Sequence, residues 1–201
     1  MHLDWPLPHR PELRDRLVAA YSTARGYHDL RHLAEVLQRI TELGAGDHRE
    51  VVLAAWFHDA VYDTAAGAGG SVPDTNEERS ARLAEQELAG EDIDVVEVAR
   101  LVRLTAEHRP GPGDTAGELL CDADLAILAS ATPRYQEYVA DVRAEYAAYD
   151  DRDFASGRIA VLEDLLGKPQ LFHTVYARKH WESPARENMA AELQRLREVL
   201  R

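Results

Sequence analysis

The chain has 201 residues, of which 45% are hydrophobic and 29% charged, the composition of an ordinary globular protein with one sizeable core. Its formal net charge of -13 argues against a long electrostatic footprint on nucleic acid, so duplex DNA is not expected as a partner. No stretch approaches the roughly 20 apolar residues of a membrane span, and the first residues lack the pattern of a secretory signal. The single Cys121 leaves no internal disulfide and is expected in the core. We therefore expect one cytoplasmic domain over residues 1–201 without a membrane partner.

Apolar residues recur at helical spacing through almost the whole chain, without the sustained alternation that is typical of strands. This pattern predicts an all-α, single-domain bundle of about eight to ten helices. Ser183 and Pro184 are typical of the start of a helix and are expected to open the last one. The expected helices cover residues 11–24, 28–43, 48–62, 76–89, 93–108, 117–130, 134–149, 152–166, 171–179 and 184–200.

The predicted helix over residues 48–62 is apolar on every side between 51 and 62, except at His58 and Asp59 near its end. Burying an ionised carboxylate in a core costs free energy unless a cation or strong hydrogen bonds compensate the charge. A bound metal ion would provide that compensation, because imidazole and carboxylate groups are ligands for several divalent ions. This pair therefore directs attention to further ligands elsewhere in the chain.

Two other predicted helices offer such ligands. His28 and His32 are four residues apart and are therefore expected on one face of the second helix. The segment 119–128 contains two carboxylates, of which Asp124 shares the apolar face and is the preferred ligand. Asp122 is expected in the outer shell or as a substitute for Asp124, and the sequence leaves this choice open. The predicted ligand set is His32, His58, Asp59 and Asp124.

The order of these ligands, His, then His-Asp, then Asp, resembles the HD superfamily of metal-dependent phosphohydrolases over roughly residues 25–130. The resemblance implies an HD-type bundle with its motif-bearing core at about 25–130 and the C-terminal helices of 134–200 packed on that core. The segments Tyr27 to His32 and Ala123 to Leu125 are also similar to cyclic-nucleotide phosphodiesterases, which implies that His32 binds metal and His28 donates a proton to the leaving oxygen. A group of small bacterial HD proteins without an established substrate is similar through residues 27–32, 58–63, 76–78, 122–125, 143–146, 157–158 and 185–188.

The implied activity is hydrolysis of a small phosphomonoester, phosphodiester or nucleotide by water that one or two divalent ions activate. The ligand types suit Mn, Fe, Co, Ni, Zn or Mg and do not distinguish among them. The catalytic roles are assigned to His28 and Asp59. Asn76 and Glu77 also suit a helix start, His108 a helix end, and the arginines salt bridges. The candidates for substrate binding are Asp63, Asn76, Glu77, His108, Arg143, Arg158 and Arg186.

Two other interpretations are left open. The chain could be a metal- or nucleotide-binding regulatory module without turnover, or a helical scaffold whose His-Asp pair is hydrogen-bonded in the core without metal. The glycine-rich segment 65–74 fits a plain loop or a lid over the substrate. The sequence also leaves the oligomeric state open, and a homodimer is one expected possibility.

Overall fold

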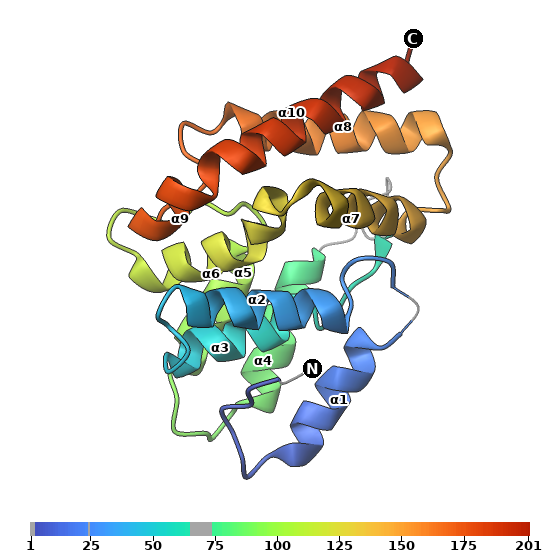
Figure 1. Cartoon of the computed structure of the whole chain (residues 1–201). Coiled ribbons are helices and arrows are strands. Elements are labelled where there is room, and N and C mark those ends of the chain that lie inside the picture. Colours follow the sequence, from blue (N-terminus) through green and yellow to red (C-terminus); the bar gives the residue numbers. More distant parts are fainter. Residues whose placement is uncertain (1–2, 24, 65–73) are drawn as a thin grey trace. The chain divides into compact units, whose positions relative to one another are not determined.

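The computed structural model describes residues 3–23, 25–64 and 74–201. This part of the chain forms ten α-helices and one 3₁₀ helix and contains no strand, which confirms the predicted all-α class (Figure 1). None of its helices combines the length and the apolar character that a membrane crossing requires. The glycine-rich segment 65–74, expected to be a plain loop or a lid, lies outside the described residues apart from Asp74.

The chain divides into two compact units, Met1–Asp124 and Leu125–Arg201. The expected packing of the C-terminal helices on the motif-bearing core stays a prediction. The first unit contains α1 (Pro11–Tyr21), α2 (Leu30–Glu42), α3 (Arg49–Phe57), α4 (Asn76–Glu87), α5 (Val95–Leu104) and nearly all of α6 (Thr115–Leu125).

Helix α3 lies in the core of the first unit, in contact with α2, α4 and α5. Every residue of α3 from Val51 to Phe57 is buried, as expected for a helix that is apolar on all sides. Its partner α2 is amphipathic and buries Leu33, Val36, Leu37 and Ile40. Because α3 is surrounded by other helices, the polar residues that follow its last turn are also drawn into the interior.

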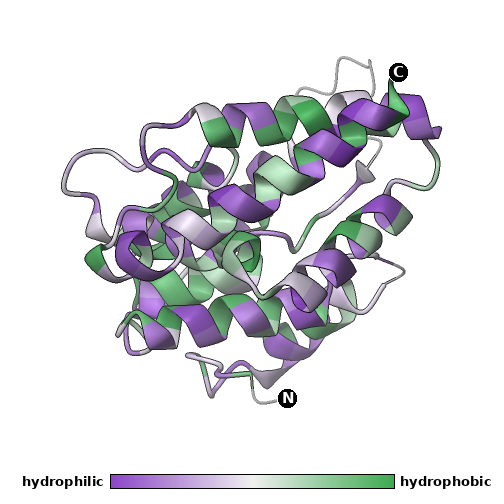
Figure 2. Cartoon of the chain, turned by 45° about the horizontal axis from the view of Figure 1, so that its top comes forward, coloured by the Kyte–Doolittle hydropathy of each residue, from purple (hydrophilic) through white to green (hydrophobic). Residues whose placement is uncertain are grey.

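The second unit contains η2 (Ala126–Ala129), α7 (Thr132–Glu145), α8 (Asp151–Gly167), α9 (Val175–His180) and α10 (Glu182–Val199). Helices α8 and α10 lie side by side, and α10 also packs against η2 (Figure 1). The amide of Asn188 fastens α10 to η2, since its Nδ2 donates to the carbonyl oxygens of Leu128 and Ser130, each at 2.9 Å. Figure 2 shows hydrophilic and hydrophobic segments alternating along the helices, the pattern expected where each helix buries one face.

All ten predicted helices have a counterpart, but several ends differ from the prediction. Helix α2 begins at Leu30 rather than at residue 28, because the Asp29 side chain caps it by accepting from the backbone N–H groups of Arg31 and His32. Helix α3 ends at Phe57 rather than at residue 62. Helix α9 begins only at Val175.

The predicted cap of the last helix is also corrected. Helix α10 begins at Glu182 and its N-cap is Trp181, without a side-chain hydrogen bond. The hydroxyl of Ser183 donates instead to Glu187 in the next turn. The ordered stretch before α10 is held by the carboxylate of Glu182, which accepts from the backbone N–H groups of Leu171 and Phe172.

Candidate metal centre

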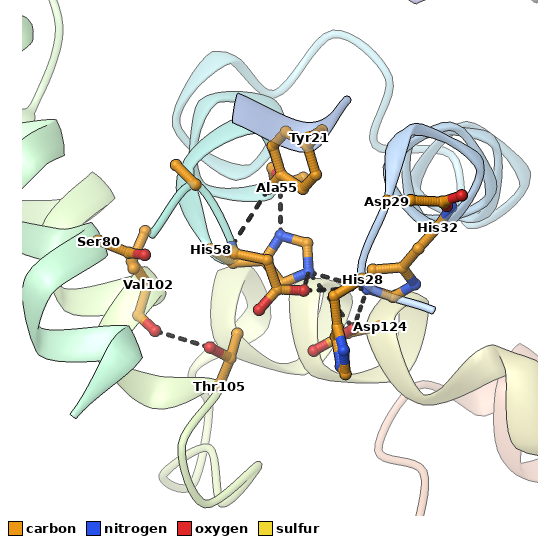
Figure 3. Close-up of polar contacts among 12 residues, drawn as sticks. Tyr21, His28, Asp29, His32, Ala55, His58, Ser80, Val102, Thr105 and Asp124 are labelled. Atoms are coloured by element: carbon orange, nitrogen blue, oxygen red, sulfur yellow. Dashed lines mark hydrogen bonds and ion pairs between the residues drawn. The ribbon is translucent and has the colours of Figure 1, made fainter. Parts of the chain in front are cut away.

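Four polar side chains from three separate segments meet in the first unit (Figure 3). The Nε2 atoms of His32 on α2 and His58 at the end of α3 lie 3.1 Å apart. The Oδ2 of Asp59 lies 3.0 Å from Nε2 of His58 and 3.4 Å from that of His32. From α6, the Oδ1 of Asp124 lies 3.2 Å from Nε2 of His32 and 3.5 Å from that of His58. The structure therefore brings the four predicted ligands together.

Local contacts aim the His58 ring at this cluster. Its Nδ1 donates to the carbonyl oxygen of Ala55 at 2.7 Å, one turn earlier in α3. Since Nδ1 carries this proton, the neutral ring presents the lone pair of Nε2 to the other three side chains. Asp59 follows directly in the turn after α3, and its backbone N–H donates to the hydroxyl of the buried Tyr21 at 3.2 Å.

The four groups shift one another's pKa values toward the charged forms. Burial alone would raise the pKa of Asp59, but the nearby imidazoles outweigh this effect and hold the pKa well below its usual value. The same balance lowers the pKa of Asp124. Burial alone would lower the pKa values of His32 and His58, but the two carboxylates raise both, that of His58 strongly. Protons shared among these groups thus compensate the buried carboxylates.

The same arrangement fits a metal ion. Ligand atoms of His32, His58 and Asp59 all lie within 4.8 Å of one another, so the three side chains could hold an ion, and all three residues are buried. A cation among two Nε2 lone pairs and two carboxylate oxygens would compete with protons for these atoms. Nitrogen and oxygen donors of this kind suit the divalent ions predicted from the sequence.

His28 lies beside this cluster but not where the sequence predicted it. The prediction that His28 and His32 share one face of a helix is wrong, because His28 precedes the capping residue Asp29 and lies outside α2. Its ring centroid is nevertheless 5.7 Å from that of His32, and the His28 ring stacks on Tyr62 with centroids 4.2 Å apart. Its role as a proton donor stays a prediction.

Burial does not favour Asp124 over Asp122 as the buried acidic residue of α6. Asp122 is completely buried, whereas the side chain of Asp124 is 12% exposed. The expectation that the carboxylate on the apolar face is the more buried one is therefore wrong. The contacts with His32 and His58 come from Asp124, as predicted.

His108 adds a fifth side chain to the neighbourhood. Its Nε2 lies 2.9 Å from Oδ2 of Asp124, the oxygen on the other side of the carboxylate from the contacts with His32 and His58. Helix α5 ends at Leu104, so His108 lies beyond the helix end rather than in its last turn. Its φ angle of 49° is in the left-handed region that residues other than glycine seldom adopt. A contact between His108 and substrate stays a prediction.

Asn76 and Glu77 lie at the start of α4, and the backbone of Asp63 is hydrogen-bonded to Asn76. The Asn76 amide forms two hydrogen bonds with the backbone of Asp63, each 3.1 Å long. Helix α4 begins at Asn76 and Glu77 lies in its first turn, as the structural alternative for these residues predicted. A role in substrate binding stays a prediction for all three.

The three arginines among the candidates for substrate binding belong to the second unit, where each guanidinium has protein partners. Arg143 donates to the carbonyl oxygens of Tyr146 and Tyr149 and pairs with Asp151. Arg158 pairs with the buried Glu192. Arg186 pairs with Glu182 and donates to two carbonyl oxygens, those of Leu166 and Lys168. Whether any of them also binds substrate stays a prediction.

Sequence reasoning missed two residues that brace the end of α3. Tyr21 is the last residue of α1, and Arg25 lies three positions before His28. The Arg25 guanidinium donates to the carbonyl oxygens of Asp59 at 2.6 Å and Ala60 at 3.2 Å. The burial of Tyr21 could have been predicted, because it lies on the apolar face of α1 with Leu13 and Leu17. This periodicity does not show which groups its hydroxyl contacts.

Comparisons with known proteins identify no family for this chain: no family model, no curated protein and no solved structure matches. Inferences about function therefore depend on the site residues and on the resemblance of their order to the HD pattern.

Proposed function

We propose that this protein is a metal-dependent phosphohydrolase of the HD type that cleaves a small phosphomonoester, phosphodiester or nucleotide. The observation that carries the proposal is the convergence of two Nε2 atoms and two carboxylate oxygens from segments that are far apart in the sequence, His32, His58–Asp59 and Asp124. Their spacing is too close for four independent surface charges, and their residue types match the ligands of divalent ions.

The protein's own residues would hold the ion and the substrate. His32, His58, Asp59 and Asp124 would bind one divalent ion, and Asp59 would be shared if a second ion were bound. When bound, such an ion supplies Lewis-acid stabilisation of a phosphoryl oxygen and lowers the pKa of the water bound to it toward neutrality. The hydrogen bond from Nδ1 of His58 to the Ala55 carbonyl keeps that ring in the tautomer that a ligand requires.

His28 is the residue best placed to act on the leaving group. Its ring lies beside His32 without being one of the four converging groups, and the stack on Tyr62 restricts its orientation. In the proposed reaction the His28 ring donates a proton to the departing oxygen, the usual task of a histidine in hydrolysis near neutral pH. A side chain in this role should matter most for substrates with poor leaving groups.

The test is the metal content of protein prepared without chelator, together with hydrolysis of an aryl phosphate and an aryl phosphodiester. We expect about one or two equivalents of a transition metal per chain and metal-dependent turnover. Asp59→Ala should lose both, whereas Asp15→Ala, which removes an exposed carboxylate on α1, should retain both.

Each other result has a definite meaning. No metal after incubation with Mn, Fe, Co and Zn would overturn the proposal and favour a hydrogen-bonded helical scaffold. Metal without turnover on any phosphoester would favour a binding or regulatory module. Turnover in Asp59→Ala at the wild-type rate would show that the active site lies elsewhere.

A further inference from the structure

The carbonyl groups at the end of α3 need partners from outside the helix. The last four carbonyl oxygens of any helix have no partner within it, and buried carbonyl groups are almost always paired. In α3, the oxygen of Ala55 accepts from the His58 ring, and that of Trp56 accepts from the hydroxyl of Tyr21 at 3.3 Å. Figure 3 shows Tyr21 next to Ala55 and His58 at this helix end. The turn that carries Asp59 is thus held by side chains.

Arg25 completes this set of contacts. Its Nη1 donates to the Asp59 carbonyl at 2.6 Å, and its Nη2 donates to the Ala60 carbonyl at 3.2 Å. The guanidinium also lies over the rings of Tyr21 and Tyr62, 5.2 and 5.7 Å from their centroids. A positive charge at the C-terminal end of a helix is favourable, because the helix dipole places partial negative charge there.

The same guanidinium reaches the segment before α2. Nη1 of Arg25 donates to the carbonyl oxygen of His28 at 3.0 Å, besides its bond to the Asp59 carbonyl. One nitrogen atom therefore joins the backbone of a proposed ligand to the backbone of the proposed proton donor. The Tyr62 ring, which stacks on the His28 ring, also contacts Arg25.

We propose that Arg25 is a positioning residue that fixes His28 and Asp59 relative to each other. The proposal rests on the proposed function for the meaning of these two residues, but the link itself consists of backbone contacts that are independent of metal. It assigns Arg25 a role distinct from phosphate binding, since its donors already bind three carbonyl oxygens. Lysine cannot reproduce this link, because its single ammonium nitrogen lacks the planar fork of a guanidinium.

The first test compares Arg25→Lys with Arg14→Lys in Co²⁺ binding. Arg14 is an exposed arginine on α1 whose guanidinium pairs with Asp15, so its replacement is the matched control. We expect Arg25→Lys to remain folded and to weaken Co²⁺ affinity by about 10- to 100-fold, the usual effect of losing a group that orients a ligand. An altered visible absorption spectrum of the bound Co²⁺ should accompany the loss. Affinity and spectrum equal to those of Arg14→Lys would overturn the proposal.

A second measurement separates this proposal from the proposed function. In metal-free protein, the histidine ring resonances of His28 and His58 should shift in Arg25→Lys and not in Arg14→Lys, as seen in ¹H–¹⁵N correlation spectra. This result would support the positioning role even if the wild-type protein bound no metal and the hydrolase proposal failed. Unchanged ring resonances in a folded Arg25→Lys protein would overturn the positioning role. If that variant did not fold, Arg25→Gln, which retains two N–H donors, would take its place in the same comparison.

Discussion

The buried cluster around Arg158 and Glu192 in the second unit contains its own permanent cation, whereas the His/Asp cluster in the first unit contains only titratable groups. The side chains of Arg158 and Glu192 are 10% and 2% exposed, and Nε of Arg158 lies 2.8 Å from Glu192. Tyr135 donates its hydroxyl to the same carboxylate, and Arg158 donates to the hydroxyl of Tyr138 at 2.8 Å. Charge and hydrogen bonds are therefore satisfied within the protein.

The His/Asp cluster has no such permanent cation among its four side chains. Its two carboxylates are compensated by protons on the neighbouring imidazoles, whose pKa values burial would lower but the carboxylates raise. A divalent ion could replace those protons, whereas the guanidinium of Arg158 leaves no comparable need in the second unit. Buried charge alone therefore does not indicate a binding site. What indicates one is buried negative charge whose compensation can be exchanged.

The largest expected effect is on stability in the second unit. Glu192→Ala should lower the free energy of unfolding by about 3–5 kcal/mol, because it leaves a buried guanidinium without its carboxylate. Chemical denaturation measures this change, and metal content should stay at the wild-type level. The control is Glu198→Ala, an exposed position on the same helix, with an expected change within about 0.5 kcal/mol. Equal effects of the two substitutions would show that the buried pair of Arg158 and Glu192 contributes no more to stability than an exposed carboxylate.

A smaller effect is expected from metal in the first unit. Mn²⁺ at about a hundredfold excess over its Kd should raise the free energy of unfolding by about 2.7 kcal/mol in the wild-type protein. The Glu192→Ala protein should show the same increase, because its ligands are intact, and Asp59→Ala should show none. Stabilisation of Asp59→Ala by the same Mn²⁺ concentration would place the binding site elsewhere.

Two tyrosine substitutions give a matched pair. Tyr135→Phe removes a hydrogen bond to the carboxylate of Glu192 and should cost about 1.5–3 kcal/mol. Tyr21→Phe removes two longer bonds between neutral groups, to the backbone of Trp56 and Asp59, and should cost about 1 kcal/mol. Thermal or chemical unfolding measures both values. A larger loss of stability in Tyr21→Phe than in Tyr135→Phe would contradict the expectation that a hydrogen bond to a carboxylate is worth more than bonds between neutral groups.

The smallest and most specific effect is a pH dependence of the metal-free protein. The pKa of His58 is raised above its ordinary value of 6.5, so its stabilising contribution is complete below that pH and is lost as the pH rises through the folded-state pKa. The pKa of Asp59 is lowered from 3.8, so its contribution is present above that pH and is lost on acidification. Arg158 stays protonated throughout and adds no slope, since Tyr138 and Glu192 outweigh the effect of burial and raise its pKa.

Unfolding curves with chelator present, recorded from about pH 5.5 to 9, check this expectation. The free energy of unfolding should fall toward high pH in the wild-type protein and fall less steeply in Asp59→Ala, which lacks one partner of the imidazoles. A slope that is the same in both proteins would show that the loss comes from groups outside the cluster.

Much of the fold could be predicted because helix periodicity is a local property. Each of the ten expected helices has a counterpart among the described residues, and α3 is buried as its continuous apolar run indicated. The ends were harder to predict. Residues after Phe57 remain apolar enough to continue α3, yet the chain turns at His58, where Tyr21 and Arg25 donate to carbonyl groups that lack a partner within the helix.

Residue types and spacing also determined the candidate ligands. His32, His58, Asp59 and Asp124 are recognisable because a core helix with a His-Asp pair needs compensation, and the other two occur on amphipathic helices. The position of His28 was predicted incorrectly because the side chain of Asp29 caps the start of α2, so that the helix begins only after His28. The burial of Asp122 was missed because helix periodicity cannot show how many faces of α6 are covered.

Residue types and periodicity predict the helical class, the order of the helices and the group of His32, His58 and Asp59 that could hold a metal ion. The partner of each charge follows from the folded arrangement alone: Glu192 for Arg158, backbone carbonyl groups for Arg25, and Asp124 for His108. The physical reason is that periodicity depends on neighbours within a few turns, whereas the compensation of a buried charge depends on atoms that only folding brings within hydrogen-bond distance.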